Sequence, residues 1–258
     1  MAMKTKVLLL ALVLAPVFAL AQDDFGTSLS VEAEKKIDKK FTVGVEAEMR
    51  TRNDMKTVDR WLGGVIASYK LTSWLKAAVS YQFLWDNNER ISYYDNDDKK
   101  VINGTVREGD PKKCAQYWGA RHRFNVSLTG SYKWGALGLS LRERWQYAYR
   151  PEHTVAERWS YYDEDWDGDE HTYEAKGKHL LRSRFQVSYK IKNFPITPFA
   201  NVELFNAMDL EKVRYNVGAD WKINKKNEIT MFYRLQKVHG DDTEGNMHLI
   251  GLKYSVKL

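Results

Sequence analysis

The sequence has a single cysteine, and after its first 21 residues it has no long apolar run. Cys114 cannot form an internal disulfide on its own, so a disulfide-stapled fold is excluded. A charged fraction of 29% and a mean hydropathy of −0.56 argue against a bundle of membrane-spanning helices. The length of 258 residues fits one barrel or one to two soluble domains.

Neither sign of charge dominates. Lys and Arg number 40 against 34 Asp and Glu, which gives a net charge of +6. The basic residues are spread over many segments, and this argues against a nucleic-acid partner. Aromatic residues are abundant, with 15 Tyr and 9 Trp, as is typical of the aromatic belts of membrane proteins.

The N-terminus has the pattern of a secretory signal peptide. Lys4 and Lys6 precede an apolar run from Val7 to Leu20, and Ala19-Leu20-Ala21 matches an A-x-A cleavage site. The run is too short for a membrane-spanning helix. We therefore predict a cleaved signal peptide over residues 1–21 and a single mature domain over residues 22–258.

The segment from Arg121 to Arg150 alternates strictly between apolar and polar residues on both sides of Gly135-Ala136. Such period-two alternation indicates two strands, each with one apolar face. Each arm exceeds the usual 5–6 residues of a soluble strand and matches the roughly 9–11 that cross a bilayer at a tilt. We expect the apolar face to meet lipid and the polar face to line a lumen. Glu143 breaks the pattern, so either a bulge turns it inward or Arg142 and Arg144 flank it in a wet spot.

The same alternation recurs in eleven segments of the mature chain. Single-chain bacterial barrels have an even number of strands, and alternating polarity places the start of the first strand on the wrong side of the membrane. The sequence therefore predicts an all-β fold, a closed antiparallel transmembrane barrel of ten to twelve strands. Residues 86–120 and 151–178 are expected as two long extracellular loops, and the short turns as periplasmic. The alternative is a soluble β-sandwich with aromatic exposed faces.

Four stretches resemble an uncharacterised (domain of unknown function) family of bacterial outer-membrane β-barrel proteins. They are Asp24–Arg52, Asp59-Arg60-Trp61, Leu141–Glu152 and Pro198–Asn206. The resemblance spans essentially the whole mature chain. It implies a location in the outer membrane of a Gram-negative bacterium and a porin-like fold, but no activity. The final alternation, Ile250 to Leu258, resembles the strand signal read by the barrel assembly machinery, although that signal usually ends in Phe or Trp.

Many charged side chains are expected to face the lumen. A narrow, anion-favouring pore is one interpretation, because rings of Arg favour anions. The other is a filled barrel whose Arg and carboxylate groups neutralise one another. The residues concerned are Arg50, Arg123, Arg142, Arg144, Arg182, Arg184, Arg214, Arg234, Glu46, Glu48, Glu203 and Asp220.

No catalytic motif is present: the six histidines lie in neither a G-x-S-x-G nor an H-E-x-x-H motif. Only His248 is expected to point towards lipid. The sequence therefore favours a non-enzymatic scaffold or interaction protein, in contact with outer-membrane lipid and a surface ligand. A narrow diffusion channel for small anionic solutes is the first alternative, and an outer-membrane lipid hydrolase is the second.

Residues 163–174 match the calcium-loop pattern D-x-[DN]-x-[DN]-G-x5-E. Calcium is the one cofactor that the sequence predicts, and it would order a loop rich in Tyr and Trp. The flanking helices of the usual calcium motif are not expected, and an acidic, solvated loop is the alternative. The candidate ligands are Asp163, Asp165, Asp167, Asp169 and Glu174.

Overall fold

The computed structural model describes residues 23–239 and 245–258. The predicted signal peptide lies outside these residues. The described chain divides into two compact units. The barrel unit contains residues up to Leu84, His122–Ala148 and Lys178–Leu258, and the loop unit contains Trp85–Arg121 and Tyr149–Gly177. No helix among the described residues is long and apolar enough to cross a membrane.

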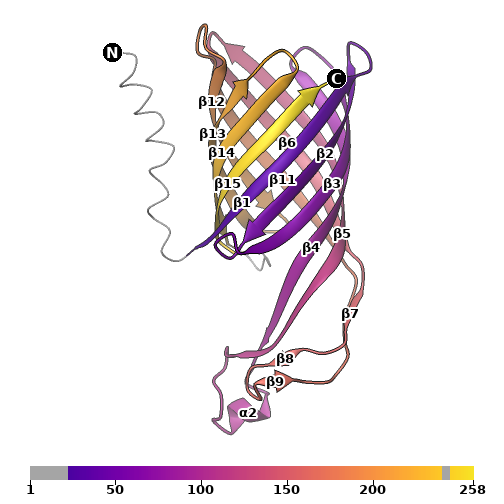
Figure 1. The fold of residues 1–258 in the computed structure, drawn as a ribbon, viewed down its shortest axis with the longest axis vertical. Coiled ribbons are helices and arrows are strands. Elements are labelled where there is room, and N and C mark those ends of the chain that lie inside the picture. Colours follow the sequence, from indigo (N-terminus) through magenta and orange to yellow (C-terminus); the bar gives the residue numbers. More distant parts are fainter. Residues whose placement is uncertain (1–22, 240–244) are drawn as a thin grey trace, which may run out of the picture. The chain divides into compact units, whose positions relative to one another are not determined.

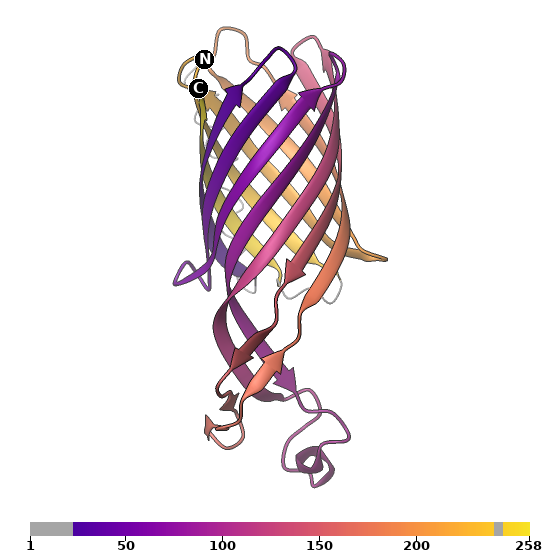
Figure 2. The ribbon, with the colours of Figure 1, turned by 90° about the vertical axis from the view of Figure 1, so that its right-hand side faces the viewer.

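Eleven strands form the barrel (Figures 1 and 2). Four of them, β4, β5, β6 and β11, also contribute residues to the loop unit. The strands are β1 (Asp24–Lys36), β2 (Phe41–Arg52), β3 (Thr57–Lys70), β4 (Leu75–Tyr93), β5 (Pro111–Trp134), β6 (Leu137–Arg150), β11 (Lys176–Tyr189), β12 (Ile196–Asn206), β13 (Leu210–Lys222), β14 (Asn227–Val238) and β15 (Met247–Lys257).

The barrel closes through a parallel pair. β1 pairs with β15 from Asp24↔Met247 to Glu34↔Lys257. β4 also pairs with β5, and this second pairing closes the sheet into a barrel. The expectation of an even strand number is therefore wrong for this chain. With an odd number, the first and last strands must point the same way, and this places the start of β1 at the end opposite the short turns (Figure 1).

The predicted alternation is confirmed along the strands. On β5, Val126 and Leu128 are exposed, whereas Asn125 and Ser127 between them are buried in the lumen. The same division holds on β11, where Leu181 is exposed and Arg182 is buried. The outer wall is thus apolar and the inner wall polar, the arrangement of a membrane-spanning barrel.

Local sequence determines the short turns. The backbone N–H groups of Lys40 and Phe41 donate to Asp38 Oδ1 at 2.6 and 2.7 Å, which lowers the pKa of Asp38. The Gly135-Ala136 turn has Gly135 at a φ of 58°, a conformation that glycine adopts without steric cost. These turns fix the registers of the hairpins that flank them.

The first predicted loop is shorter than expected. β4 continues to Tyr93 and β5 begins at Pro111, so much of residues 86–120 is strand, with one short helix, α2 (Lys99–Ile102). The second contains four short strands, β7 (His153–Val155), β8 (Trp159–Ser160), β9 (Asp165–Trp166) and β10 (His171–Tyr173). Within the loop unit the Tyr117 ring stacks on His153 and Tyr173, with centroids 4.3 and 5.3 Å apart. The loop unit is therefore folded, and stacked aromatic rings contribute to its packing.

Glu143 is not turned inward, and its sequence neighbours Arg142 and Arg144 are not its partners. The exposed side chains of Leu141 and Trp145 continue the outer face through this position. On that face Ser183 Oγ of the adjacent strand β11 donates to Glu143 Oε2 at 2.6 Å. Sequence alone could not show this partner, because it lies 40 residues away.

Candidate functional site

Four arginines form one side of the lumen, which we call the arginine wall. Arg142 and Arg144 lie two residues apart on β6, and Arg182 and Arg184 lie two residues apart on the adjacent strand β11. Residues two apart on a strand share a face, so the inward alternation brings all four side chains together.

Glu203 on β12 is the carboxylate that this wall shares. Arg142 Nη2 donates to Glu203 Oε1 at 2.5 Å, and Arg182 Nη2 donates to the same oxygen at 3.1 Å. Arg182 Nη1 also donates to Gln146 Oε1 at 2.8 Å. One carboxylate thus holds two guanidinium groups, while four contribute positive charge to the wall.

Phe205 extends this network with an aromatic face. It is 2% exposed and lies two residues from Glu203 on β12. The guanidinium carbons of Arg182 and Arg214 lie 4.4 and 4.6 Å from its ring centroid, and Lys212 Nζ lies at 5.2 Å. These cation–π contacts hold long basic side chains against the wall.

Carboxylates gather on another side of the lumen, the acidic wall, formed by Glu32 and Glu34 on β1 and Glu46 and Glu48 on β2. Lys253 Nζ pairs with Glu32 Oε2 at 2.8 Å. Within β2, Arg50 Nη2 pairs with Glu48 Oε1 at 3.0 Å, and Gln82 Nε2 of β4 donates to Glu46 Oε1 at 2.7 Å.

A cavity of about 520 Å³ lies between the two walls. Around the closed sheet β11 is five strands from β1 in one direction and six in the other, so the walls face each other across the lumen. Predicted lumen residues that line it are Glu46, Glu48, Arg142, Arg144, Arg182, Arg184, Glu203, Asp220 and Arg234.

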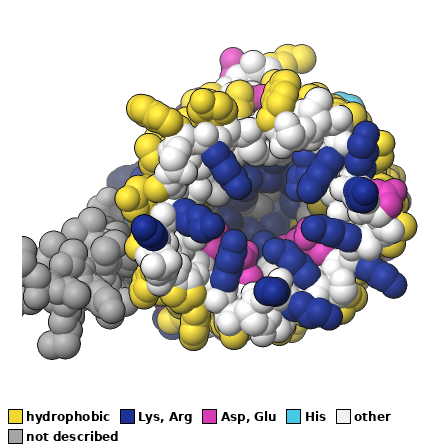
Figure 3. Space-filling view, turned by 90° about the horizontal axis from the view of Figure 1, so that it is seen from above, with side chains coloured by type: hydrophobic (Ala, Val, Ile, Leu, Met, Phe, Trp, Pro, Cys, Tyr) yellow, Lys and Arg dark blue, Asp and Glu magenta, His cyan; other side chains and the backbone are white. Residues whose placement is uncertain are grey.

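The opening at the short-turn end is basic (Figure 3). Exposed lysines lie at the strand ends and in the turns of this opening, and we call them the lysine collar. Seen from this end, Lys and Arg side chains surround the hollow (Figure 3). The collar consists of Lys36, Lys39, Lys40, Lys70, Lys133, Lys190, Lys192, Lys222, Lys225, Lys226 and Lys257.

A family model with the description "Protein of unknown function (DUF2490)" matches residues 25–247. The chain belongs to this family. The family establishes no activity, in keeping with the resemblance read from the sequence. A search of curated proteins found no match.

Solved structures similar to this DUF2490 chain include two autotransporter domains and a channel. The β domain of the Bordetella autotransporter BrkA shares 9% identity at a TM-score of 0.50, over 85% of this chain and 82% of that one. The translocator domain of the autotransporter NalP from Neisseria meningitidis shares 11%, at 0.47, over 83% and 73%. The CymD monoaromatic hydrocarbon channel shares 8%, at 0.36, over 83% and 82%. At these identities the BrkA likeness shows the fold alone.

The three remaining lumen predictions also lie on the inner wall. Arg50 and Arg214 are buried, and Arg214 Nε donates to Gln236 Oε1 at 2.7 Å. Arg123 Nη1 lies 3.4 Å from Gln82 Oε1. Lys253, Phe205 and the lysine collar were not singled out from the sequence, although the inward positions of Lys253 and Phe205 follow from the alternation. The effect of these groups on ion selectivity stays a prediction.

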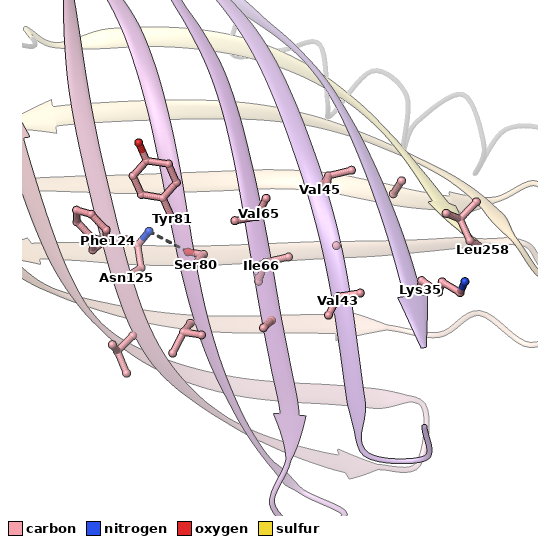
Figure 4. Close-up of a pocket in the computed structure, with 15 residues that line it drawn as sticks. Lys35, Val43, Val45, Val65, Ile66, Ser80, Tyr81, Phe124, Asn125 and Leu258 are labelled. Atoms are coloured by element: carbon pink, nitrogen blue, oxygen red, sulfur yellow. Dashed lines mark hydrogen bonds between the residues drawn. The ribbon is translucent and has the colours of Figure 1, made fainter. Parts of the chain in front are cut away.

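A second hollow, of about 720 Å³, lies on strands β1 to β5 and is apolar (Figure 4). Small side chains such as Val43, Val45 and Val65 line it, and Val45 and Val65 are exposed on the outer wall. Asn125 Nδ2 donates to Ser80 Oγ at 3.0 Å on the inner side of the same strands. This hollow belongs to the surface that would meet lipid.

Three histidines, and not His248 alone, lie on the outer wall of the DUF2490 barrel. His122 stacks with Tyr81 at 6.1 Å and His179 with Trp145 at 5.6 Å, both on the apolar face. The expectation that only His248 points towards lipid is therefore wrong: β5 begins at Pro111, so His122 lies within the strand and shares the outward face of Phe124 and Val126. His248 Nδ1 bonds Tyr233 Oη at 2.5 Å, and His248 Nε2 lies 3.3 Å from Asp23. The serine that the hydrolase alternative requires is not among these contacts of His248.

Three of the predicted calcium ligands, Asp163, Asp165 and Asp167, accept hydrogen bonds within the loop unit. Asp163 accepts from Ser160 Oγ and Lys100 Nζ, at 2.7 and 3.2 Å. Asp165 accepts from Trp166 N, while Asp169 and Glu174 are exposed. Within the described ranges, no three His, Cys, Asp or Glu side chains are grouped to hold a metal ion. Calcium binding stays a prediction, which a tryptophan-fluorescence titration of the wild type against an Asp165→Ala/Asp167→Ala variant would test.

Asp167 is the best-anchored of these carboxylates. Lys113 Nζ donates to it at 2.8 Å, Arg158 Nε at 3.2 Å and the Arg158 backbone N–H at 2.8 Å. Burial disfavours its charged form, but these hydrogen bonds outweigh burial and hold the pKa of Asp167 well below its ordinary value. Its ion pairs join Lys113 and Arg158 within the loop unit.

Proposed function

We propose that this protein is an outer-membrane barrel that gives small anionic solutes a narrow passage through its lumen. The observation that carries this proposal is the cavity between the arginine wall and the acidic wall. A filled, self-neutralised core would leave no such cavity, and its basic groups would each have an acidic partner.

The exposed surface supports the membrane location. The outer wall is apolar, and Trp74, Tyr132 and Trp134 are exposed near the short turns, where an aromatic belt would meet the membrane interface. The lysine collar would raise the local concentration of anions at this opening, because a basic rim attracts counter-ions from a distance. Insertion by the barrel assembly machinery and contact with outer-membrane lipid are part of the same proposal.

Single-channel recording in planar bilayers tests the passage. We expect discrete conductance steps and a reversal potential that shifts towards the anion equilibrium under a KCl gradient. An Arg144→Gln/Arg184→Gln variant should lose most of this preference. A Lys99→Gln/Arg107→Gln variant removes two positive charges from exposed positions of the loop unit and should keep the preference. Protein that is folded and inserted but gives no steps would refute the channel.

A non-enzymatic interaction scaffold is the second candidate. The loop unit favours it, since Tyr93, Tyr161, Tyr162 and Trp166 are exposed on a folded unit. Exposed aromatics of this kind are frequent in binding surfaces. Binding of lipopolysaccharide vesicles that is lost in a Tyr162→Ser/Trp166→Ser variant, while conductance is absent, would favour the scaffold over the channel.

A further inference from the structure

Two guanidinium groups of the arginine wall have no hydrogen-bond or ion-pair partner among the described residues. Arg142 and Arg182 bind Glu203, but in the described chain Arg144 and Arg184 make neither a hydrogen bond nor an ion pair. Arg184 lies directly opposite Glu203 in the β11–β12 register, yet Glu203 bonds its neighbours instead.

The register of β6 against β11 shows how the four arginines are arranged. Ser183 bonds Glu143, and the backbone N–H of Lys190 donates to the carbonyl of Ala136. Both contacts belong to one antiparallel register, which sets Arg144 opposite Arg182 and Arg142 opposite Arg184. Opposite residues lie about 5 Å apart and residues two apart on one strand about 7 Å apart. The four arginines thus form a square, and Glu203 makes ion-pair contacts along one diagonal only.

Because these guanidinium groups are buried, the lack of a partner costs free energy. The Nε atoms of Arg142, Arg144, Arg182 and Arg184 are buried without a hydrogen-bond acceptor. A buried donor left unpaired is costly, and like charges opposite one another across strands repel. With four arginines and one glutamate the square has a formal charge of +3, so it still favours negative charge.

We propose that Arg144 and Arg184 bind the oxyanion head, phosphate or carboxylate, of a small dianionic solute. Guanidinium groups suit this task, because their forked N–H donors match the oxygens of phosphate and carboxylate two at a time. The cavity of about 520 Å³ faces the pair and gives room for the rest of a small solute. The carboxylates Glu32 and Glu48 opposite are already paired with Lys253 and Arg50, which leaves the arginine wall as the side with unpaired positive charge.

The site rests on the proposed function to the extent that the lumen must be open to solutes from one end. Glu203 is the group that opposes binding, because it lies beside the same arginines.

Isothermal titration of the detergent-folded barrel with inorganic phosphate, at constant ionic strength in chloride, tests the site. We expect saturable binding, and succinate should compete with phosphate. Loss of two charge-assisted contacts in Arg144→Gln/Arg184→Gln should weaken binding by about ten-fold or more. Lys99→Gln/Arg107→Gln should bind as the wild type does. Arg144→Lys/Arg184→Lys keeps the charge but lacks the forked donors, so it should fall between the two.

Equal phosphate affinity in the wild type and the Gln variant, or saturation by chloride alone, would overturn the site. Heat-modifiable migration on gels verifies that each variant is folded, and the Lys variant serves if the Gln variant is not. Phosphate binding without conductance would leave the site standing and remove the channel. Conductance with the same anion preference in the wild type and the Gln variant, without phosphate binding, would leave the channel standing and remove the site.

Discussion

Replacing Glu203 by glutamine removes the carboxylate that Arg142 and Arg182 share, while it keeps the shape and an oxygen acceptor. The side chain is 7% exposed, so water replaces little of the lost charge. At about 4 Å, two unit charges interact by about 4 kcal/mol with an effective dielectric of 20. Breaking a buried ion pair from one side costs about 3–5 kcal/mol. The amide still accepts hydrogen bonds, so we expect Glu203→Gln to lower the free energy of unfolding by about 3 kcal/mol.

Urea unfolding followed by tryptophan fluorescence, in lipid vesicles at low anion concentration, measures this change. Asp220→Asn is the matched control, because Asp220 lines the same cavity and accepts from Thr230 Oγ1 at 2.7 Å. Its effect should stay within about 1 kcal/mol. Equal effects of the two substitutions would refute the role given to Glu203. A second arm adds 100 mM phosphate. At a Kd of about 10 mM, phosphate should raise the free energy of unfolding of Glu203→Gln by about 1.4 kcal/mol.

Three further predictions concern the outer wall, the sheet and the loop unit. Glu143→Leu should stabilise the barrel by about 1 kcal/mol in urea unfolding, because a charge on the lipid face is unfavourable, and no gain would contradict the outward placement of Glu143. Gly218→Ala should destabilise it by about 1–3 kcal/mol, since a Cβ there would meet the carbonyl oxygen of Met231 at 2.4 Å; Gly63→Ala, with nothing within 4 Å, should be neutral. The hydrogen bonds that lower the pKa of Asp167 stabilise the loop unit. This stabilisation is complete above the ordinary carboxyl pKa of about 4, and it is lost as the pH falls towards the folded-state pKa. Tryptophan fluorescence should report a transition on acidification that Asp167→Asn lacks, and identical acid profiles would exclude Asp167 as its source.

The strands could be predicted from the sequence because their signal is local. Each segment meets lipid on one face and a polar lumen on the other, so side-chain alternation records the fold residue by residue, as in Val126 and Asn125. The strands within the loop unit lack this signal. Asp86 to Arg90 is a polar run, and its pairing depends on partners such as Arg121, 35 residues away, whose Nε donates to Asp86.

Closure could have been predicted in the same way, but the site geometry could not. The eleven alternating segments of the sequence already imply that the first and last strands run in parallel, and only the expectation of an even strand number argued against it. The inward direction of the arginines was predicted, but their partners were not. Arg142 and Glu203 are 61 residues apart, and only the sheet order brings them together.

The parallel pairing of β1 with β15 has a consequence for rearranging the chain. In a barrel of hairpins with an even strand count, the two ends of the sheet emerge on one side, and a short linker could join them to make a circular permutant. Here Asp24 pairs with Met247 at one end of the barrel, and Glu34 pairs with Lys257 at the other. A linker from the end of β15 to the start of β1 must retrace the eleven residues of β15, about 36 Å. Permutants with linkers shorter than about eleven extended residues should therefore be unable to close the barrel.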